Sequence, residues 1–181
     1  LFFSKPKITE MSGDMTTKGS KMQVKGTFFG PTTSTITATI GGLVCTDVVW
    51  KTDATLELVT PPLTGSDAST DMAVVVTAGS QPSDETFKFT YTAPTITSVD
   101  LLSQVNSDGS TTITLLGTDF ADVATSRIAV STRSTGSADV SCTNIQRISS
   151  EKLTCDLVSR LCTDRNIFIT VAGQESTNTA V

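Results

Sequence analysis

Apolar residues alternate with polar ones along most of the chain, with a period of two residues. Met22 and Val24 stand between polar neighbours, and Ile113 and Leu115 repeat the pattern in the second half of the chain. Such alternation is typical of a β-strand with one buried face. No long stretch places apolar residues at helical spacing. The pattern therefore predicts many short strands and no long helix.

Clusters of turn-forming residues separate these stretches. They include Gly41-Gly42, Pro61-Pro62, Gly65-Ser66-Asp67 and Asn106-Ser107-Asp108-Gly109. About seven short strands in roughly 90 residues is the spacing of an immunoglobulin-like sandwich. Abundant Thr, which is β-branched, also favours strands. The sequence predicts an all-β chain of tandem immunoglobulin-like β-sandwiches; the alternative is a barrel or one larger sandwich.

An internal repeat sets the domain organisation. Five blocks recur in the same order, which indicates a duplicated unit. Residues 6–11, 22–30, 36–40 with Cys45, 55–58 and 72–79 match residues 94–99, 113–121, 127–130 with Cys142, 152–155 and 166–173. The repeat predicts one domain over residues 6–93 and a second over residues 94–181.

The repeat also gives an expectation for both ends of the chain. Residues 1–6 align with residues 89–94, so residues 1–5 are expected to be the end of the last strand of a preceding repeat. Residues 173–181 align with residues 79–87, so the last strand of the second domain is expected to be incomplete. We therefore expect a window onto a longer array. The alternative is that one chain completes the sandwich of another by strand addition.

The repeated blocks resemble a known family. The first repeat carries Gly26-Thr27-Phe28-Phe29-Gly30, then Pro61-Pro62, then Phe89-Thr90-Tyr91-Thr92-Ala93-Pro94, a pattern similar to the IPT/TIG domain. In the second repeat Ser159-Arg160 replaces the two prolines. The family occurs in plexins and growth-factor receptors, in protist and bacterial surface proteins, in Rel-type transcription factors and in some carbohydrate-active enzymes. The resemblance implies E-set-type sandwiches that bind or position other molecules, and the fold alone does not choose among these contexts.

The same resemblance implies a disulfide between Cys142 and Cys155. In the first repeat the partner of Cys45 falls at Leu58, so that bond is missing, and Cys45 and Cys162 stay unassigned. A disulfide implies an oxidising, extracytoplasmic setting. The alternative is that all four cysteines are small buried apolar residues. Zinc is not expected, since the chain has no His.

Charge and composition exclude several classes of function. Thirteen basic and eighteen acidic residues give a net charge of −5, which argues against a nucleic-acid partner. No apolar run is long enough for membrane insertion within this segment. Without His, the usual general base is missing, and no catalytic residue or cofactor is expected. A calcium site using Asp14 or Asp100 is the remaining metal alternative, but no dense acidic loop supports it.

Two hydroxyl-rich clusters are candidate acceptors for O-linked glycans, at residues 32–35 and 131–135; the alternative is that both are polar loop tips. The lone Trp50 is expected to pack at a sandwich end; the alternative is that it is exposed at a contact surface. Two functions remain. The first is a non-catalytic extracellular or cell-surface array for adhesion or recognition, acting as a spacer and protein-binding module. The second is a structural repeat of an extracellular filament, in which neighbouring repeats or copies of the chain assemble.

Overall fold

The structure, a computed structural model, describes residues 4–65, 69–105, 109–134, 137–157 and 166–177. Strands make up nearly all of the regular structure, and the one helical element in these ranges is the short 3-10 turn η1 (Thr125–Arg127). The chain divides into two compact units. Unit 1 holds residues 1–62 and 68–91, and unit 2 holds residues 63–67 and 92–181. The all-β prediction is confirmed.

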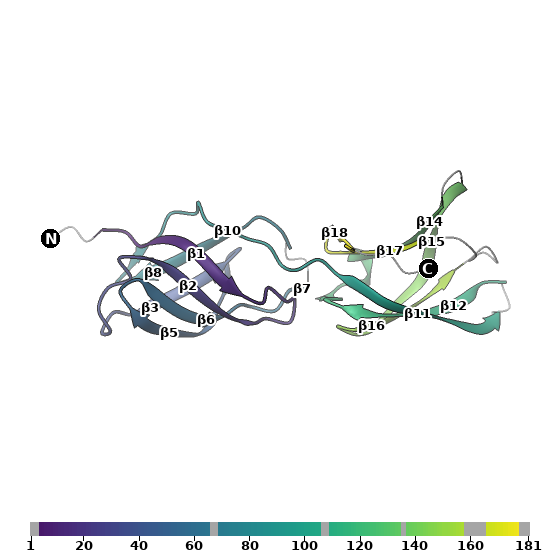
Figure 1. The fold of residues 1–181 in the computed structure, drawn as a ribbon, viewed down its shortest axis with the longest axis horizontal. Helices are drawn as coiled ribbons and strands as arrows, with labels where there is room; N and C mark the ends of the chain where they lie inside the picture. The colour runs from purple at the N-terminus through teal and green to yellow at the C-terminus, as the bar shows by residue number, and fades with distance from the viewer. Residues whose placement is uncertain (1–3, 66–68, 106–108, 135–136, 158–165, 178–181) are drawn as a thin grey trace. The chain divides into compact units, whose positions relative to one another are not determined.

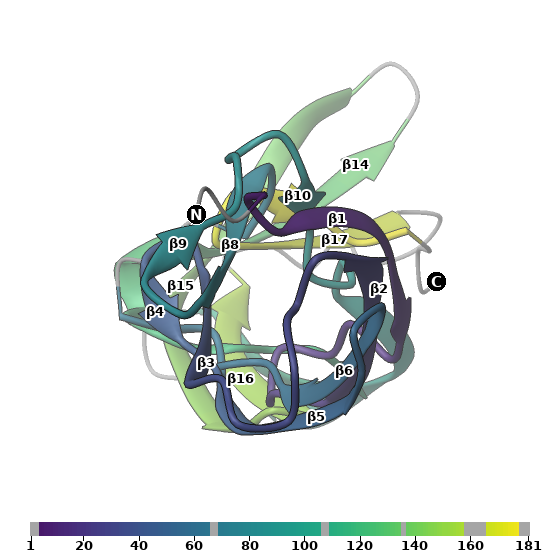
Figure 2. The same ribbon diagram turned by 90° about the vertical axis from the view of Figure 1, so that its left-hand side faces the viewer.

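Unit 1 is a sandwich of two antiparallel sheets, seen from its end in Figure 2. The first sheet has the strand order β1-β2-β6-β5, and the second has the order β10-β8-β3-β4 with β9 beside β8. The first sheet comprises β1 (Lys7–Gly13), β2 (Lys21–Thr27), β6 (Thr55–Val59) and β5 (Thr46–Thr52). The second comprises β10 (Lys88–Phe89), β8 (Met72–Ala78), β3 (Ile36–Ile40), β4 (Leu43–Val44) and β9 (Gln81–Pro82).

Unit 2 repeats the sandwich as one continuous sheet of seven strands, in the order β11-β12-β16-β15-β14-β17-β18 (Figure 1). Its strands are β11 (Thr95–Val105), β12 (Thr111–Thr118), β16 (Lys152–Leu157), β15 (Ser137–Ser149), β14 (Ile128–Ser134), β17 (Asn166–Val171) and β18 (Gln174–Glu175). The contacts also place β7 (Thr64–Gly65) in this unit, where it pairs in parallel with β13 (Asp122–Val123).

Alternation of apolar residues builds both cores, as the sequence predicts. Val24, Leu56 and Val74 are fully buried in unit 1, and Leu115, Leu153 and Ile169 are fully buried in unit 2. Strand register shows that the units are equivalent position by position: Met22 lies opposite Leu58 in unit 1, as Ile113 lies opposite Cys155 in unit 2. The two units can therefore be compared residue by residue.

The Gly-Thr-x-Phe motif makes the same turn in both units. After Gly26 and Thr27, Phe28 adopts a left-handed backbone with φ 62°, and Phe29 returns to the core with no exposed surface. The N–H of Phe29 donates to the carbonyl of Asp53 at 3.0 Å. In unit 2 Asp119 has φ 60°, Phe120 is fully buried, and its N–H donates to the carbonyl of Ser150 at 3.0 Å.

Two of the aligned blocks need a correction of register. Residues 36–40 match residues 128–132, because Ala38 lies opposite Val76 as Val130 lies opposite Ile169. The sequence comparison matched Gly79 with Gly173, whereas the structure places Ala172 at the position of Gly79. In unit 1 the N–H of Val76 donates to the hydroxyl of Ser83 at 3.0 Å, and in unit 2 the N–H of Ile169 donates to the hydroxyl of Ser176 at 3.3 Å. These matched contacts align Gly79 with Ala172, one residue before Gly173. The sequence comparison went wrong here because either of the two residues of this tight turn can be glycine.

Candidate binding surface

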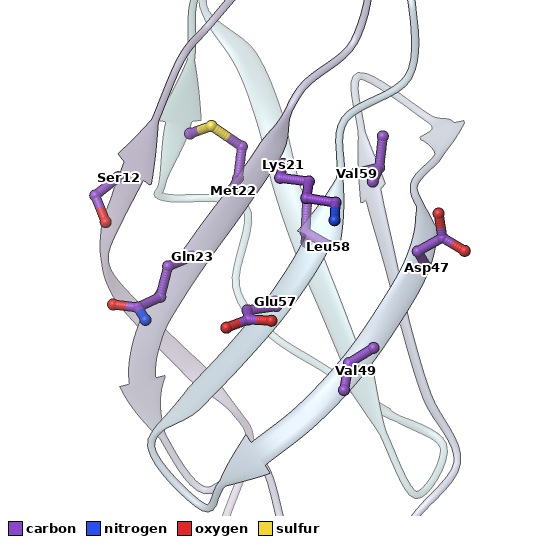
Figure 3. Close-up of a pocket in the computed structure, with 9 residues that line it drawn as sticks. All are labelled: Ser12, Lys21, Met22, Gln23, Asp47, Val49, Glu57, Leu58 and Val59. Carbon is purple, nitrogen blue, oxygen red and sulfur yellow. The ribbon is translucent and has the colours of Figure 1, made fainter.

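A shallow groove lies on the outer face of the first sheet of unit 1. Its volume is about 450 Å³, and Figure 3 shows the side chains that line it. The lining residues are Ser12, Lys21, Met22, Gln23, Asp47, Val49, Glu57, Leu58 and Val59. None of them is aromatic, and Met22 and Leu58 are core residues whose edges close the floor.

Strand register orders the outward side chains of the groove in two rows across the sheet. In one row Gln23 lies opposite Glu57, which lies opposite Val49. In the other row Lys21 lies opposite Val59, which lies opposite Thr46, with Asp47 next along β5. Figure 3 shows Lys21 and Asp47 on β2 and β5, with β6 and Val59 in the middle.

The charges of the groove differ in how they are paired. Lys51 lies beside the groove, and its Nζ forms an ion pair with Glu57 Oε2 at 3.0 Å. The side chains of Lys21 and Asp47, in contrast, have no hydrogen-bond or ion-pair partner among the described residues. Val49 adds an exposed apolar side chain, with 46% of its surface accessible. The groove therefore offers one free cation and one free anion, within the part of the chain that the structure describes, beside an apolar surface.

The matching face of unit 2 is satisfied internally. Asp156 stands at the position of Val59, Thr112 at that of Lys21, and Asn144 at that of Asp47. The hydroxyl of Thr112 donates to Asp156 Oδ1 at 2.6 Å, and Asn144 Nδ2 donates to Asp156 Oδ2 at 2.8 Å. This network spans three strands. The fold is thus compatible with a face whose polar side chains bond to one another. Lys21 and Asp47 of unit 1, unpaired within the described part of the chain, are replaced in unit 2 by residues that are bonded in this way.

The cysteines lie in equivalent places with different chemistry. In unit 2 Cys142 on β15 and Cys155 on β16 form a disulfide, with their Cα atoms 5.7 Å apart. In unit 1 Cys45 occupies the position of Cys142 and Leu58 the position of Cys155. Burial raises the pKa of the Cys45 thiol to about 12, so this cysteine stays a neutral, unreactive thiol at physiological pH. Cys162 lies outside the described residues.

The other candidates from the sequence are placed as follows. Asp14 and Asp100 are exposed, and within the described ranges no group of three metal-ligating side chains could hold an ion. Thr32, Thr33 and Thr35 are exposed in the turn before β3. The second hydroxyl cluster begins within strand β14, where Thr132 is 1% exposed. A loop tip was therefore the wrong prediction for that part of the cluster, because strand pairing buries every second side chain.

Trp50 is half-buried, and its indole N–H donates to the carbonyl of Gly30 at 2.8 Å. Arg147 takes the same position in unit 2, where its Nε donates to the carbonyl of Phe120 at 2.7 Å. Both side chains therefore hold the turn that follows the Gly-Thr-x-Phe motif. This role explains the lone Trp as part of the fold.

An exposed ion pair in unit 2 is the other charge cluster of note. Arg133 donates from Nη1 and Nη2 to the two carboxylate oxygens of Glu175, at 2.9 and 2.6 Å, and stacks 4.3 Å from the ring centroid of Phe168. The guanidinium hydrogen bonds hold the pKa of Glu175 below its ordinary value. Since its groups are paired with one another, we assign this cluster to the surface structure of the sheet.

Phe28 combines an exposed aromatic ring with a left-handed backbone. Its ring is 53% exposed, and its backbone conformation is one that aromatic residues rarely adopt. It lines a second hollow of about 340 Å³ with Gly30, Pro31 and Gly79 among others.

Replacing Phe28 with Asp, the residue at the equivalent position 119, should raise the free energy of unfolding of unit 1 by up to about 1 kcal/mol. Asp tolerates the left-handed region better, and the exposed ring contributes little to the core. Urea unfolding of the variant and the wild type measures the difference. Phe29→Leu, at the buried neighbour, is the control and should destabilise; a similar loss for Phe28→Asp would contradict the prediction.

Among the described residues the structure has no helix of the length and apolarity needed to cross a membrane. No curated protein matches the chain by sequence.

Solved structures resemble the chain in fold. The surface glycan-binding protein PbSGBP-B from Prevotella bryantii is 15% identical over 98% of the chain, with a TM-score of 0.51. The extracellular region of plexin A4 is 14% identical over 98% of the chain, with a TM-score of 0.41. An auxiliary nutrient-binding protein from Bacteroides thetaiotaomicron is 16% identical over 93% of the chain, with a TM-score of 0.36. The chain spans 41%, 18% and 43% of these structures, respectively.

The family model described as the IPT/TIG domain matches the chain twice, over residues 6–91 and 94–181. Domains of this family are typically non-catalytic binding or structural modules. The two matches cover nearly the whole sequence, in agreement with the two sandwiches of the structure. The chain therefore belongs to the IPT/TIG domain family.

Proposed function

We propose that this chain is an extracytoplasmic, non-catalytic pair of IPT/TIG domains that acts in cell-surface adhesion or recognition, as a spacer that binds another protein through the groove of unit 1. One observation carries the proposal. Lys21 and Asp47 are unpaired among the described residues and lie beside exposed Val49, whereas the equivalent positions of unit 2 are bonded to one another. Unpaired opposite charges beside an apolar surface favour a polypeptide partner with complementary charges.

The lining of the groove favours protein over carbohydrate as the partner. Sugar rings are commonly held by flat aromatic side chains, and none of the nine lining residues is aromatic. The glycan-binding protein PbSGBP-B is similar in fold, at 15% identity. A glycan is therefore the weaker proposal for this groove.

The disulfide supports an extracytoplasmic location. Disulfides persist in oxidising compartments and are rare in the cytosol. The Cys142–Cys155 bond is flanked by buried side chains, with Cys142 7% and Cys155 1% exposed. A buried bond of this kind is a structural rather than a transient link.

The location is tested on the protein in the cells that make it. Intact cells are labelled with a membrane-impermeant amine reagent, and free thiols are trapped in acid before purification. We expect labelling of exposed lysines without permeabilisation, and Cys142 and Cys155 recovered as a disulfide by mass spectrometry. Cys45 serves as the internal control, because it should be recovered as a thiol. Labelling only after permeabilisation, with Cys142 and Cys155 both reduced, would contradict the proposed location.

A further inference from the structure

We propose that the groove face of unit 1 is self-complementary and binds the same face of a second copy of this chain, with Lys21 of each copy against Asp47 of the other. This inference rests on the proposed binding role of the groove and names its partner. It follows from the arrangement of free charges on the sheet, from what the surrounding charges are paired with, and from the area of the face.

The positions of the free charges fit a two-fold axis. Lys21 on β2 and Asp47 on β5 lie on either side of the central strand β6, where Val59 lies opposite Lys21. Neighbouring strands are about 4.8 Å apart, so the two charges are separated by roughly 10 Å across the sheet. When two copies meet face to face, a two-fold axis that lies between the faces and runs along β6 near Val59 exchanges their positions. A second copy related by this axis places its carboxylate over Lys21 and its ammonium over Asp47.

The neighbouring charges leave this complementarity intact. Glu57 is held by Lys51, and Glu10 is held by Lys25 at 3.2 Å, so both carboxylates are neutralised within one copy. The free charges of the groove are then one positive and one negative. Two such faces attract each other through two cross-copy pairs of Lys21 with Asp47. Val59 lies at the axis, and Glu57, on the same strand, is held by Lys51 of its own copy.

Unit 2 does not offer the same contact. Asp156 at the axis position would bring two carboxylates together, and its hydrogen bonds to Thr112 and Asn144 already occupy both oxygens. Pairing through the equivalent face of unit 2 would therefore bury like charges. The self-complementary face is restricted to unit 1.

The area of the face sets the expected strength. The longest of its four strands has seven residues, which gives a face of roughly 20 Å by 20 Å. Two such faces bury on the order of 1,000 Å² in total, at the lower limit of specific interfaces. We therefore expect a weak, transient dimer, with a Kd on the order of 10 μM to 1 mM, which many copies on one surface would reinforce by avidity.

The test is a charge exchange measured by sedimentation velocity on the whole chain, from about 10 μM to about 1 mM. Wild type should form dimers that weaken as salt rises. Lys21→Asp alone leaves two acidic groups in the groove, and Asp47→Lys alone leaves two basic groups. Each single variant should dimerise at least roughly tenfold more weakly than wild type, because both cross-copy pairs become repulsive.

An equimolar mixture of the two single variants separates this geometry from a general charge effect. The acidic groove of one variant then faces the basic groove of the other, so dimers should return in the mixture. The double variant Lys21→Asp/Asp47→Lys should also dimerise, because its charges are exchanged but still complementary. Lys88→Asp and Glu85→Lys reverse exposed charges on unit 1 outside the groove and are the controls, expected to dimerise as wild type does.

Several outcomes would overturn the inference. Wild type that stays monomeric to the highest concentration, dimers indifferent to both single reversals, or a mixture that stays monomeric would each do so. Assemblies that grow beyond the dimer would replace the two-fold contact with the filament alternative. Unfolding curves of every variant verify that the sandwiches are folded. These results are independent of the surface-labelling and thiol measurements, so failure of the dimer leaves a heterologous protein partner as the proposed ligand of the groove.

Discussion

Replacing Gly117 with Ala is expected to lower the free energy of unfolding of unit 2 by about 3 kcal/mol, at the upper end of overpacking costs. A Cβ at this position would lie 1.9 Å from the carbonyl oxygen of Thr95 and 2.6 Å from Cζ of Phe120. The first atom is backbone of the paired strand β11, so the strand itself must move. Urea unfolding followed by circular dichroism measures the change as a shift of midpoint at constant slope.

Gly26→Ala should reproduce the effect in unit 1, where a Cβ would lie 2.1 Å from the carbonyl oxygen of Lys7 and 2.6 Å from Cζ of Phe29. Gly173→Ala is the matched control in unit 2. It has a left-handed backbone with φ 90° but no atom within 4 Å of the added carbon. The control therefore costs only backbone strain, about 1 kcal/mol. A loss for Gly117→Ala no larger than that of Gly173→Ala would show that the close approach is not limiting.

These glycines illustrate what the sequence predicts well. The repeated Gly-Thr-x-Phe pattern indicates a bend followed by a buried aromatic residue, and the structure confirms both features in each unit. Local chemistry suffices here, because the left-handed third residue, the close approach at the glycine and the returning ring all belong to one short motif. The period-two alternation is equally local, and it identifies the core strands for the same reason.

The groove could not be predicted from the pattern of any one strand. Lys21, Asp47 and Val59 are distant in sequence, and only the register of three strands brings them together. A bulge on β5 between Thr46 and Val49 also shifts the pairing there, and alternation alone cannot count such a bulge. The signal that could have found the site is the contrast between repeats, since Val59 replaces the acidic Asp156 at a position where the fold accepts both.

The sequence also could not predict the pairing of strands that are only two residues long. The parallel contact of β7 with β13 joins Thr64 to Asp122 and carries no apolar pattern. The one-residue error in aligning Gly79 has a similar origin. In the alignment the match of glycine with glycine outweighed the match of alternating buried residues in β8 and β17. Short polar segments are specified by distant backbone partners rather than by their own side chains.

Removing the disulfide is the second large effect we expect. The double variant Cys142→Ala/Cys155→Ala should lower the free energy of unfolding of unit 2 by about 3 kcal/mol. The two cysteines are 13 residues apart, and their bond restricts the unfolded chain over that loop. Reducing the wild-type protein should produce a similar loss, whereas the stability of unit 1 should stay unchanged under both treatments. Unfolding of unit 2 that is insensitive to reductant would contradict a structural role for the bond.

Unit 1 offers the reciprocal experiment, because Cys45 and Leu58 occupy the positions of the disulfide pair. Under oxidising conditions the Leu58→Cys variant should form a disulfide with Cys45, which raises the free energy of unfolding of unit 1 by about 1–2 kcal/mol. The gain is smaller than that of the bond in unit 2 because Leu58 is 1% exposed, and its truncation removes core packing. In the reduced state only that loss remains, so the same variant should be less stable than wild type by about 1–2 kcal/mol. The sign of the effect should therefore reverse with redox state, which a simple packing defect cannot do.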